Sequence, residues 1–158
     1  MFDAILNKLK EILEENDKIS IVYNYEASEF KGDPVAVISP SSNESDYNTT
    51  EENVRIYAFM VRLFVKRNSP RKPEDADRIL RKLVDSVIND FDKYYTLSAF
   101  GTDGSPIPGG AIINPTGYTF INVFAAPSSW GYSGREDEYR VAEILVRCRV
   151  SVNLSAIT

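Results

Sequence analysis

Histidine is absent from this chain of 158 residues, and cysteine occurs only once, at Cys148. The absence of histidine removes the commonest general base at neutral pH and the commonest metal ligand. Serine–histidine or cysteine–histidine catalysis and the usual zinc, copper and haem sites therefore lack the residues they need. One cysteine cannot form a disulfide within a chain, and we expect Cys148 to be a buried, inert thiol on the apolar face of a strand.

Long apolar runs, excess positive charge and phosphate-binding loops are also missing. No apolar stretch approaches the ~18 residues of a membrane-spanning helix, so we expect no membrane association. The net charge is −5, which argues against sequence-specific nucleic-acid binding because such proteins present a basic surface. No glycine-rich phosphate loop follows a predicted strand. The first residues lack the basic region and continuous apolar core of a signal peptide, which predicts synthesis in a reducing cytoplasm.

Acidic side chains are the remaining candidates for catalysis. Several lie on the polar side of a predicted helix, where solvated carboxylates are the simpler interpretation: Asp75, Asp77, Asp85, Asp90 and Asp92. Residues 136–138 are acidic and stand beside Arg135 and Arg140, so we expect weak surface ion pairs there. A carboxylate pair for hydrolysis needs a concave apolar pocket, and no spacing indicates one. We therefore expect neither enzymatic activity nor a cofactor, with an acid-based hydrolase as the least favoured class.

The spacing of apolar residues predicts a single α+β domain over residues 1–158. Hydrophobic residues make up 43% of the chain and charged residues 26%, which is typical of a globular domain. Helical spacing occurs at 2–15 and 76–91, with Pro73 near the start of the second helix. Strands are predicted at 19–25, 35–38, 53–66, 118–124 and 139–154, loops at 39–52 and 100–117, and a turn at 127–134. We expect a mixed, mainly antiparallel sheet of about four to five strands with two amphipathic helices packed on one face.

The predicted strand 53–66 is apolar on both of its sides. One side carries Arg55, Tyr57, Phe59, Val61, Leu63 and Val65, and the other carries Val54, Ile56, Ala58, Met60, Arg62 and Phe64. Two helices can cover only one face of the sheet. Burying a large apolar side chain is worth ~1.5–3 kcal/mol, so three or four left in water forfeit on the order of 5–10 kcal/mol. Either the Gly- and Pro-rich loop 100–117 or another subunit covers the second face, and we favour another subunit.

Seven residues are candidates for a subunit or partner interface. They are Arg55, Tyr57, Phe59, Trp130, Tyr132, Arg147 and Arg149. Trp and Tyr are common interface anchors, although a cap on one end of the core is the simpler interpretation of the two aromatic residues in the predicted turn. The two arginines of the last strand form a basic stripe that contacts either water or an acidic patch of a neighbouring copy.

A series of short motifs runs through nearly the whole chain. After the N-terminal amphipathic helix they are Tyr23-Asn24-Tyr25, residues 30–40 (FKGDPVAVISP), 53–61 (NVRIYAFMV), 76–80 (ADRIL), 127–132 (PSSWGY) and 139–144 (YRVAEI). In this order the motifs resemble the tail terminator or tail-completion proteins of long-tailed bacteriophages, which belong to the proteins that join head and tail.

The resemblance implies an α+β domain that closes into a ring, usually of six copies, on the head-proximal end of the tail tube. Such a ring stops tube polymerisation and offers a surface for head attachment. The implied partners are further copies of this chain, the tail tube protein, and a head–tail connector or completion protein. The resemblance also implies a structural virion protein of the tail, assembled in the host cytoplasm, and it supplies no catalytic residues.

Two other functions stay open. One is a head–tail neck or completion protein, which is close in role. The other is a cytoplasmic, non-enzymatic binding module whose apolar sheet face receives a peptide or a small ligand. A ring elutes as an oligomer, whereas a binding module is expected to run at 17.8 kDa, the mass of one chain.

Overall fold

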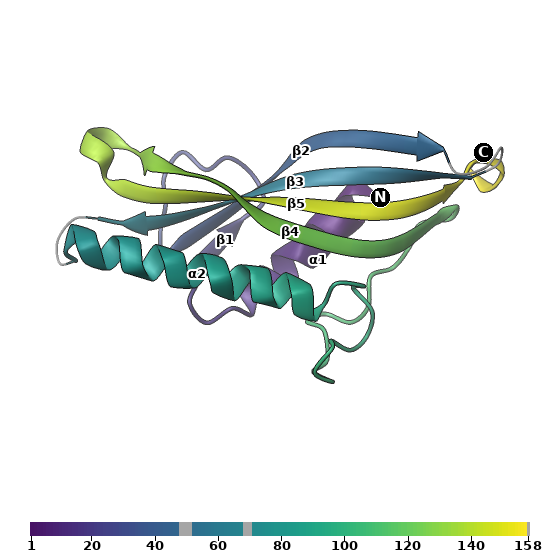
Figure 1. Ribbon diagram of the computed structural model, residues 1–158, viewed down its shortest axis with the longest axis horizontal. Helices are drawn as coiled ribbons and strands as arrows, with labels where there is room; N and C mark the ends of the chain where they lie inside the picture. Colours follow the sequence, from purple (N-terminus) through teal and green to yellow (C-terminus); the bar gives the residue numbers. More distant parts are fainter. Residues whose placement is uncertain (48–51, 68–70, 158) are drawn as a thin grey trace.

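A long, twisted sheet with two helices on one side forms the protein (Figure 1). The computed structural model describes residues 1–47, 52–67 and 71–157, with side chains for 1–41, 53–67 and 71–157. Within those ranges the elements are α1 (Phe2–Glu14), β1 (Ile21–Tyr23), β2 (Val35–Tyr47), β3 (Glu52–Lys66), α2 (Pro73–Lys93), β4 (Tyr118–Ser133), the 3₁₀ turn η1 (Arg135–Asp137), β5 (Tyr139–Asn153) and the 3₁₀ turn η2 (Leu154–Ala156). The predicted α+β fold is confirmed.

The described strands form one five-stranded sheet in the order β1-β2-β3-β5-β4. The short β1 runs parallel to β2, and all other neighbours are antiparallel, so the prediction of a mixed, mainly antiparallel sheet is confirmed. β3 and β5 pair along their whole lengths, from Glu52 opposite Asn153 to Lys66 opposite Tyr139. β2 leads to β3 at one end of the sheet, and β4 leads to β5 at the other end (Figure 1).

The polar segment after Ile38 is strand where the sequence predicts a loop. β2 continues to Tyr47 and pairs with β3 up to the pair of Tyr47 and Asn53. The prediction of a loop is therefore wrong for residues 39–47, and residues 48–51 lie outside the described ranges. Backbone pairing with β3 defines this segment, and backbone pairing leaves no apolar alternation in the sequence.

The segment around Trp130 is also strand where the sequence predicts a turn. β4 continues to Ser133, and the chain reverses only between Gly134 and Glu138. β4 is an edge strand with two register shifts, one of them between Pro127 and Ser129. An edge strand with a bulge tolerates proline, which has no N–H to donate to a ladder. Proline and glycine therefore mark an irregular edge here, and not a turn.

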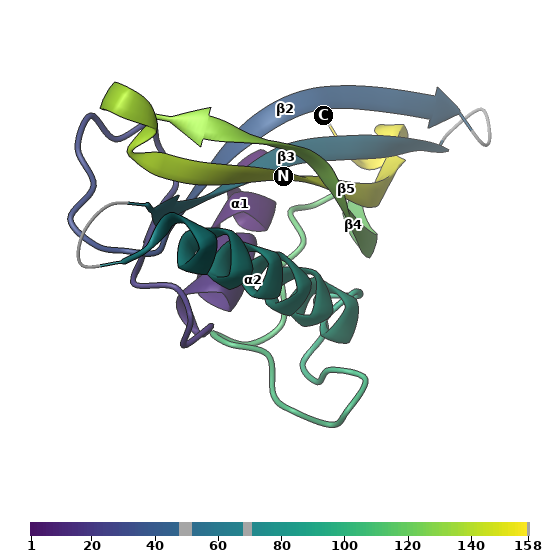
Figure 2. The same ribbon diagram turned by 60° about the vertical axis from the view of Figure 1, so that its left-hand side comes forward.

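Both helices pack on the same face of the sheet (Figure 2). α1 buries Ile5, Leu9, Ile12 and Leu13, which recur at helical spacing on one side. α2 begins with Pro73, where the missing N–H costs no intrahelical bond, and acidic residues of its first turn favour the positive end of the helix dipole. The two predicted helices are confirmed, with α2 starting at Pro73.

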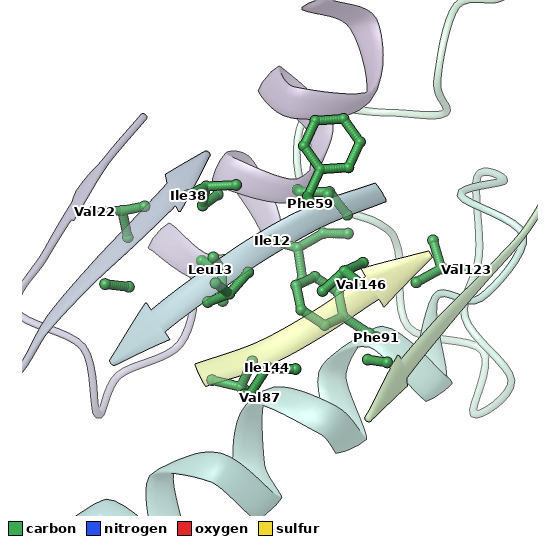
Figure 3. Close-up of a cluster of buried hydrophobic side chains, with 14 of the residues drawn as sticks. Ile12, Leu13, Val22, Ile38, Phe59, Val87, Phe91, Val123, Ile144 and Val146 are labelled. Carbon is green, nitrogen blue, oxygen red and sulfur yellow. The ribbon is translucent and has the colours of Figure 1, made fainter. Parts of the chain in front are cut away.

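The main core lies between this helix layer and the sheet (Figure 3). Ile12 and Leu13 of α1 and Val87 and Phe91 of α2 face sheet residues that include Val22, Ile38, Phe59, Val123, Ile144 and Val146. On β5, alternate residues from Ala142 to Val152 are at most 1% exposed, as the period-two pattern predicts. Leu154, predicted on the same face, lies in η2 and is 38% exposed.

The long segment between α2 and β4 lies on the helix side of the molecule (Figure 2). Ile107 is 4% exposed and belongs to the main core. Lys8 of α1 donates a hydrogen bond of 2.9 Å to the backbone oxygen of Pro108 and another to that of Gly110. This Gly- and Pro-rich loop therefore does not cover the second face of the sheet.

Candidate functional site

The second face of the sheet, opposite the helices, is covered by its own chain at one end. The segment between β1 and β2 folds over this end, where the Phe30 ring lies 4.7 Å from that of Phe64 and 5.5 Å from that of Tyr139. Strand residues of this small cluster, among them Val35 and Val141, are at most 9% exposed. The expectation that the chain can cover only one face is therefore corrected here, because the sequence pattern did not reveal that Phe30 returns to the sheet.

Toward the other end, the second face carries exposed side chains. Phe124 on β4 is 63% exposed and lies opposite Arg147 of β5, which is exposed together with Arg149. Ala58 and Val54 of β3 are only 4% and 6% exposed, so less apolar area is open than the sequence predicts. The open-face patch consists of Ile56, Met60, Phe124, Leu145, Arg147 and Arg149.

The open-face patch is positively charged. Arg62, on the same face, bonds Glu26 at 3.0 Å and lies 3.8 Å from Glu143. In contrast, Arg147 and Arg149 form no salt bridge with any other described residue. Both guanidinium groups are exposed to water and can contact a partner, as the sequence-based alternative of an acidic neighbour requires.

Tyr57 and Phe59 belong to the core, not to an open surface. They are 3% and 0% exposed, because α1 covers the side of β3 on which they lie. The Phe2 ring lies 4.7 Å from the Tyr57 ring and 5.8 Å from the Phe59 ring, both edge-on. The structure therefore removes these two side chains from the candidate interface.

Arg55 lies on the same side of β3 as Tyr57, near the end of the sheet. A side-chain hydrogen bond with Tyr57 raises the pKa of Arg55, partial burial opposes this, and Tyr118 adds to the increase. Arg55 is half-buried and remains charged at any physiological pH. It lies on the face opposite Arg147 and Arg149, so the three arginines do not form one basic surface.

Trp130 and Tyr132 lie together near the end of the β4–β5 hairpin, on the helix side of the sheet. The guanidinium carbons of Arg67 and Arg140 lie 4.8 and 4.6 Å from the centre of the Tyr132 ring. Arg140 Nε also donates to an Asp77 carboxylate oxygen of α2 at 2.8 Å. Cation–π contacts are worth about 0.5–2 kcal/mol each and hold such a ring in one orientation.

Much of this aromatic surface faces water. Trp130 is 45% and Tyr132 is 53% exposed, and Trp130 borders a shallow cavity of about 120 Å³ with Leu80 and Arg81 of α2. Arg67 donates to a backbone oxygen, and neither Arg67 nor Arg81 has a salt bridge within the described residues. The hairpin cluster consists of Arg67, Arg81, Trp130, Tyr132 and Arg140.

A groove that the sequence did not predict lies at the far end of α2. It has a volume of about 390 Å³ and is formed by the C-terminal ends of both helices and the loop before β4. Its lining residues include Ile12, Glu15, Asp90, Lys93, Tyr94 and Ile107. Lys93 lies 3.4 Å from the Asp103 carboxylate, which neutralises its charge. The carboxylates of Glu15 and Asp90 therefore give the groove an excess of negative charge. This hollow is the acidic groove.

Asp90 and Cys148 have perturbed pKa values for a common reason. Burial raises the pKa of Asp90, and a 2.8 Å hydrogen bond from the Asn16 amide opposes the increase. Burial also raises the pKa of the Cys148 thiol, which is 0% exposed, so the prediction that this cysteine is buried is confirmed. No group of three or more His, Cys, Asp or Glu side chains in the described ranges is placed to bind a metal ion.

The seven predicted interface residues thus fall into separate places. Arg147 and Arg149 lie together on the second face, Trp130 and Tyr132 lie at the hairpin end, and the three residues of β3 lie on the helix side. Sequence reasoning missed Arg67, Arg81 and Arg140, which are far apart in the chain and meet around the two aromatic rings. None of the described helices is both long and apolar enough to cross a membrane.

The sequence matches no protein-family model and no curated protein.

Proposed function

We propose that this protein is a tail terminator of a long-tailed bacteriophage. In this role it forms a ring, of six copies in related proteins, on the head-proximal end of the tail tube. The ring stops polymerisation of the tube and provides the interface for head attachment. The support comes from the order of motifs in the sequence and from the α+β fold, with both helices on one face of a mainly antiparallel sheet.

The observation that carries the proposal is the open-face patch. An exposed phenylalanine beside two arginines without carboxylate partners in the described chain is a composition typical of protein interfaces, in which aromatic residues and Arg are enriched. Desolvating Phe124, which is 63% exposed, favours association, and the arginines select a surface of opposite charge. A protein that acts only through contacts with other proteins needs such a surface and no reaction centre.

The test is a tube-length assay. Tail tube protein from the same phage is polymerised alone and with the purified protein, and tube lengths are measured by negative-stain microscopy. We expect ring-shaped particles of the protein alone or on one end of each tube, and shorter tubes as its concentration rises. Unchanged tube lengths, with the protein on neither end, would overturn the proposal.

A surface variant connects this assay to the open-face patch. Phe124→Ser combined with Arg147→Ser is expected to weaken capping, because the variant loses both the apolar contact and a positive charge. Tyr25→Ser combined with Lys31→Ser is the matched control, since Tyr25 is 61% exposed and Lys31 is exposed on the segment between β1 and β2. Equal loss of capping in both variants would show that the patch has no special role.

The same assay separates the terminator from the neck protein. A neck protein binds the head connector or the finished tail and leaves polymerising tube protein unaffected. Purified connector and tail tube protein, each immobilised separately, show which of them retains the chain. Retention by the connector alone would favour the neck protein over the terminator.

A further inference from the structure

Two surfaces on the helix side of this chain are complementary in charge. The hairpin cluster exposes aromatic rings and carries excess positive charge, and the acidic groove is concave, with a mainly polar lining and excess negative charge. We infer that the hairpin cluster of one copy inserts into the acidic groove of the next copy. This inference rests on the proposed ring and names the two surfaces that join its subunits.

The groove has the space and the charge to receive an arginine side chain. Its residues Ile12 and Ile107 are 1% and 4% exposed and belong to the main core, so the groove lies on a well-packed part of the fold. A volume of about 390 Å³ lies within the range of small-ligand pockets. Glu15 is exposed and has no salt bridge among the described residues, so its carboxylate is available to a guanidinium group.

The hairpin cluster has the chemistry to fill that groove. Trp130 and Tyr132 are both exposed, and the Tyr132 ring is held by Arg67 and Arg140, so little rotamer entropy is lost when Tyr132 binds. Arg140 is neutralised by Asp77, and the excess positive charge therefore comes from Arg67 and Arg81. Aromatic residues and arginine dominate the binding energy of protein interfaces when they enter a pocket.

The two surfaces lie at different places along α2. The hairpin cluster contacts α2 near Asp77, and the groove includes Asp90, about thirteen residues or roughly 20 Å farther along the helix. A contact between two different surfaces is heterologous, and each added copy presents a new surface for the next. Such a contact forms a ring when the rotation between copies closes. The proposed ring requires this type of contact.

Reciprocal charge reversal tests the inference. Glu15→Lys reverses the groove, and Arg81→Glu reverses the cluster. Both side chains are exposed, so both variants are expected to fold, which circular dichroism verifies. Each variant alone is expected to need at least about tenfold higher concentration to assemble, because like charges then meet at the contact. Asp85→Lys and Lys31→Glu are controls with the same change of charge at exposed sites outside both surfaces.

Mixing the two variants gives the decisive result. In a mixture, every junction between unlike copies pairs either two unchanged surfaces or two reversed ones, so assembly is expected to return. Light scattering of each variant, of the equimolar mixture and of the double variant measures this return. Assembly of both single variants at the wild-type concentration, loss without rescue in the mixture, or an exclusively monomeric wild-type chain would each overturn the inference.

The tube-length assay distinguishes failure of this inference from failure of the proposed function. A protein that caps tubes but tolerates both reversals retains the proposed function and uses another subunit contact. A protein that assembles through these two surfaces but leaves tube length unchanged retains the inferred contact and loses the proposed function.

Discussion

Lys8 places an ammonium group where α1 meets the loop before β4, at only 6% exposure. A buried charge is stable only when hydrogen-bonding partners replace its water. Lys8 pairs with Glu11 and donates to the backbone oxygens of Pro108 and Gly110, and so ties the loop to the helix. Gly109 between them has a φ of +73°, and a Cβ there would clash with Glu11, so glycine is required at this close approach.

Replacing Lys8 is expected to loosen this attachment. Lys8→Met keeps the length of the side chain but leaves the backbone oxygens of Pro108 and Gly110 and the Glu11 carboxylate without their donor. We expect a loss of about 1–3 kcal/mol in the free energy of unfolding, measured by urea denaturation. Lys10→Met is the control, because Lys10 makes only a surface pair with Glu14 at 3.8 Å. Equal stability of the two variants would contradict the proposed role of Lys8.

Asp90 predicts a pH dependence with a definite sign. Burial raises its pKa in the folded protein above the ordinary value of 3.8, despite the hydrogen bond from Asn16. Folding therefore favours the protonated form, and this contribution to stability is lost as the pH rises from 3.8 through the folded pKa. Asp90→Asn removes this loss, so the variant is expected to gain stability relative to the wild type over that interval.

Urea denaturation of both proteins from about pH 3 to about pH 7 measures this difference. Asp85→Asn, on the exposed side of the same helix, controls for the loss of one negative charge. A stability difference between Asp90→Asn and the wild type that stays constant across the range would contradict the assignment.

At the scale of elements, the two faces of the sheet have different tasks. The face toward α1 and α2 is closed by Phe59 and its neighbours, whereas the opposite face exposes Phe124. Phe59→Ala is expected to cost about 3–5 kcal/mol of stability because it leaves a cavity in the core. Phe124→Ala is expected to change stability by at most about 0.5 kcal/mol and to reduce capping of tail tubes.

Urea denaturation and the tube-length assay of the two alanine variants measure both effects. The contrast between them is the informative quantity, since each variant removes the same ring from a strand of the same sheet. A strongly destabilised Phe124→Ala would show that Phe124 packs within the chain and would remove it from the interface.

The fold was predictable from sequence where burial imposes a period. Both helices and the strands β3 and β5 carry such a period, and their positions were predicted to within a few residues. Residues 39–47 and 127–133 escaped prediction, because backbone pairing and edge bulges define those strand segments and neither leaves an apolar pattern. Proline and glycine at an edge strand have the same appearance in a sequence as in a turn.

The interface was predictable only in part, for a related reason. Arg147 and Arg149 were found because a strand alternates, and their exposure follows from that alternation. Tyr57 and Phe59 were misassigned, because a strand that is apolar on both sides does not indicate which side the helices cover. The hairpin cluster joins β3, α2, β4 and β5, and the acidic groove joins two helix ends with a loop, so both depend on tertiary structure.

At the scale of the whole molecule, the distribution of charge matters more than the net charge of −5. Positive charge without partners in the described chain occurs at the hairpin cluster and the open-face patch, and negative charge occurs at the acidic groove. Copies therefore attract each other through particular surfaces although they repel as a whole. Salt screens both the attraction between these surfaces and the general repulsion between copies. Screening of the attraction weakens the specific contact.

Assembly is consequently expected to weaken at high salt. The Debye length falls from ≈ 8 Å at 0.15 M to 3 Å at 1 M ionic strength, which screens contacts between exposed charges. We expect the concentration needed for assembly to rise severalfold over this range, as measured by light scattering. The urea midpoint of the Lys31→Glu control is expected to match that of the wild type at each ionic strength. Stronger assembly at high salt would show instead that apolar burial alone joins the copies.

α2 contributes residues to both surfaces of the inferred contact, Arg81 to the hairpin cluster and Asp90 and Lys93 to the acidic groove. An incomplete ring then has a free acidic groove at one end and a free hairpin cluster at the other. Only the closing junction joins these two surfaces. Because the helix fixes how far and at what angle successive copies are displaced, the copy number is a property of the monomer's geometry and needs no external template.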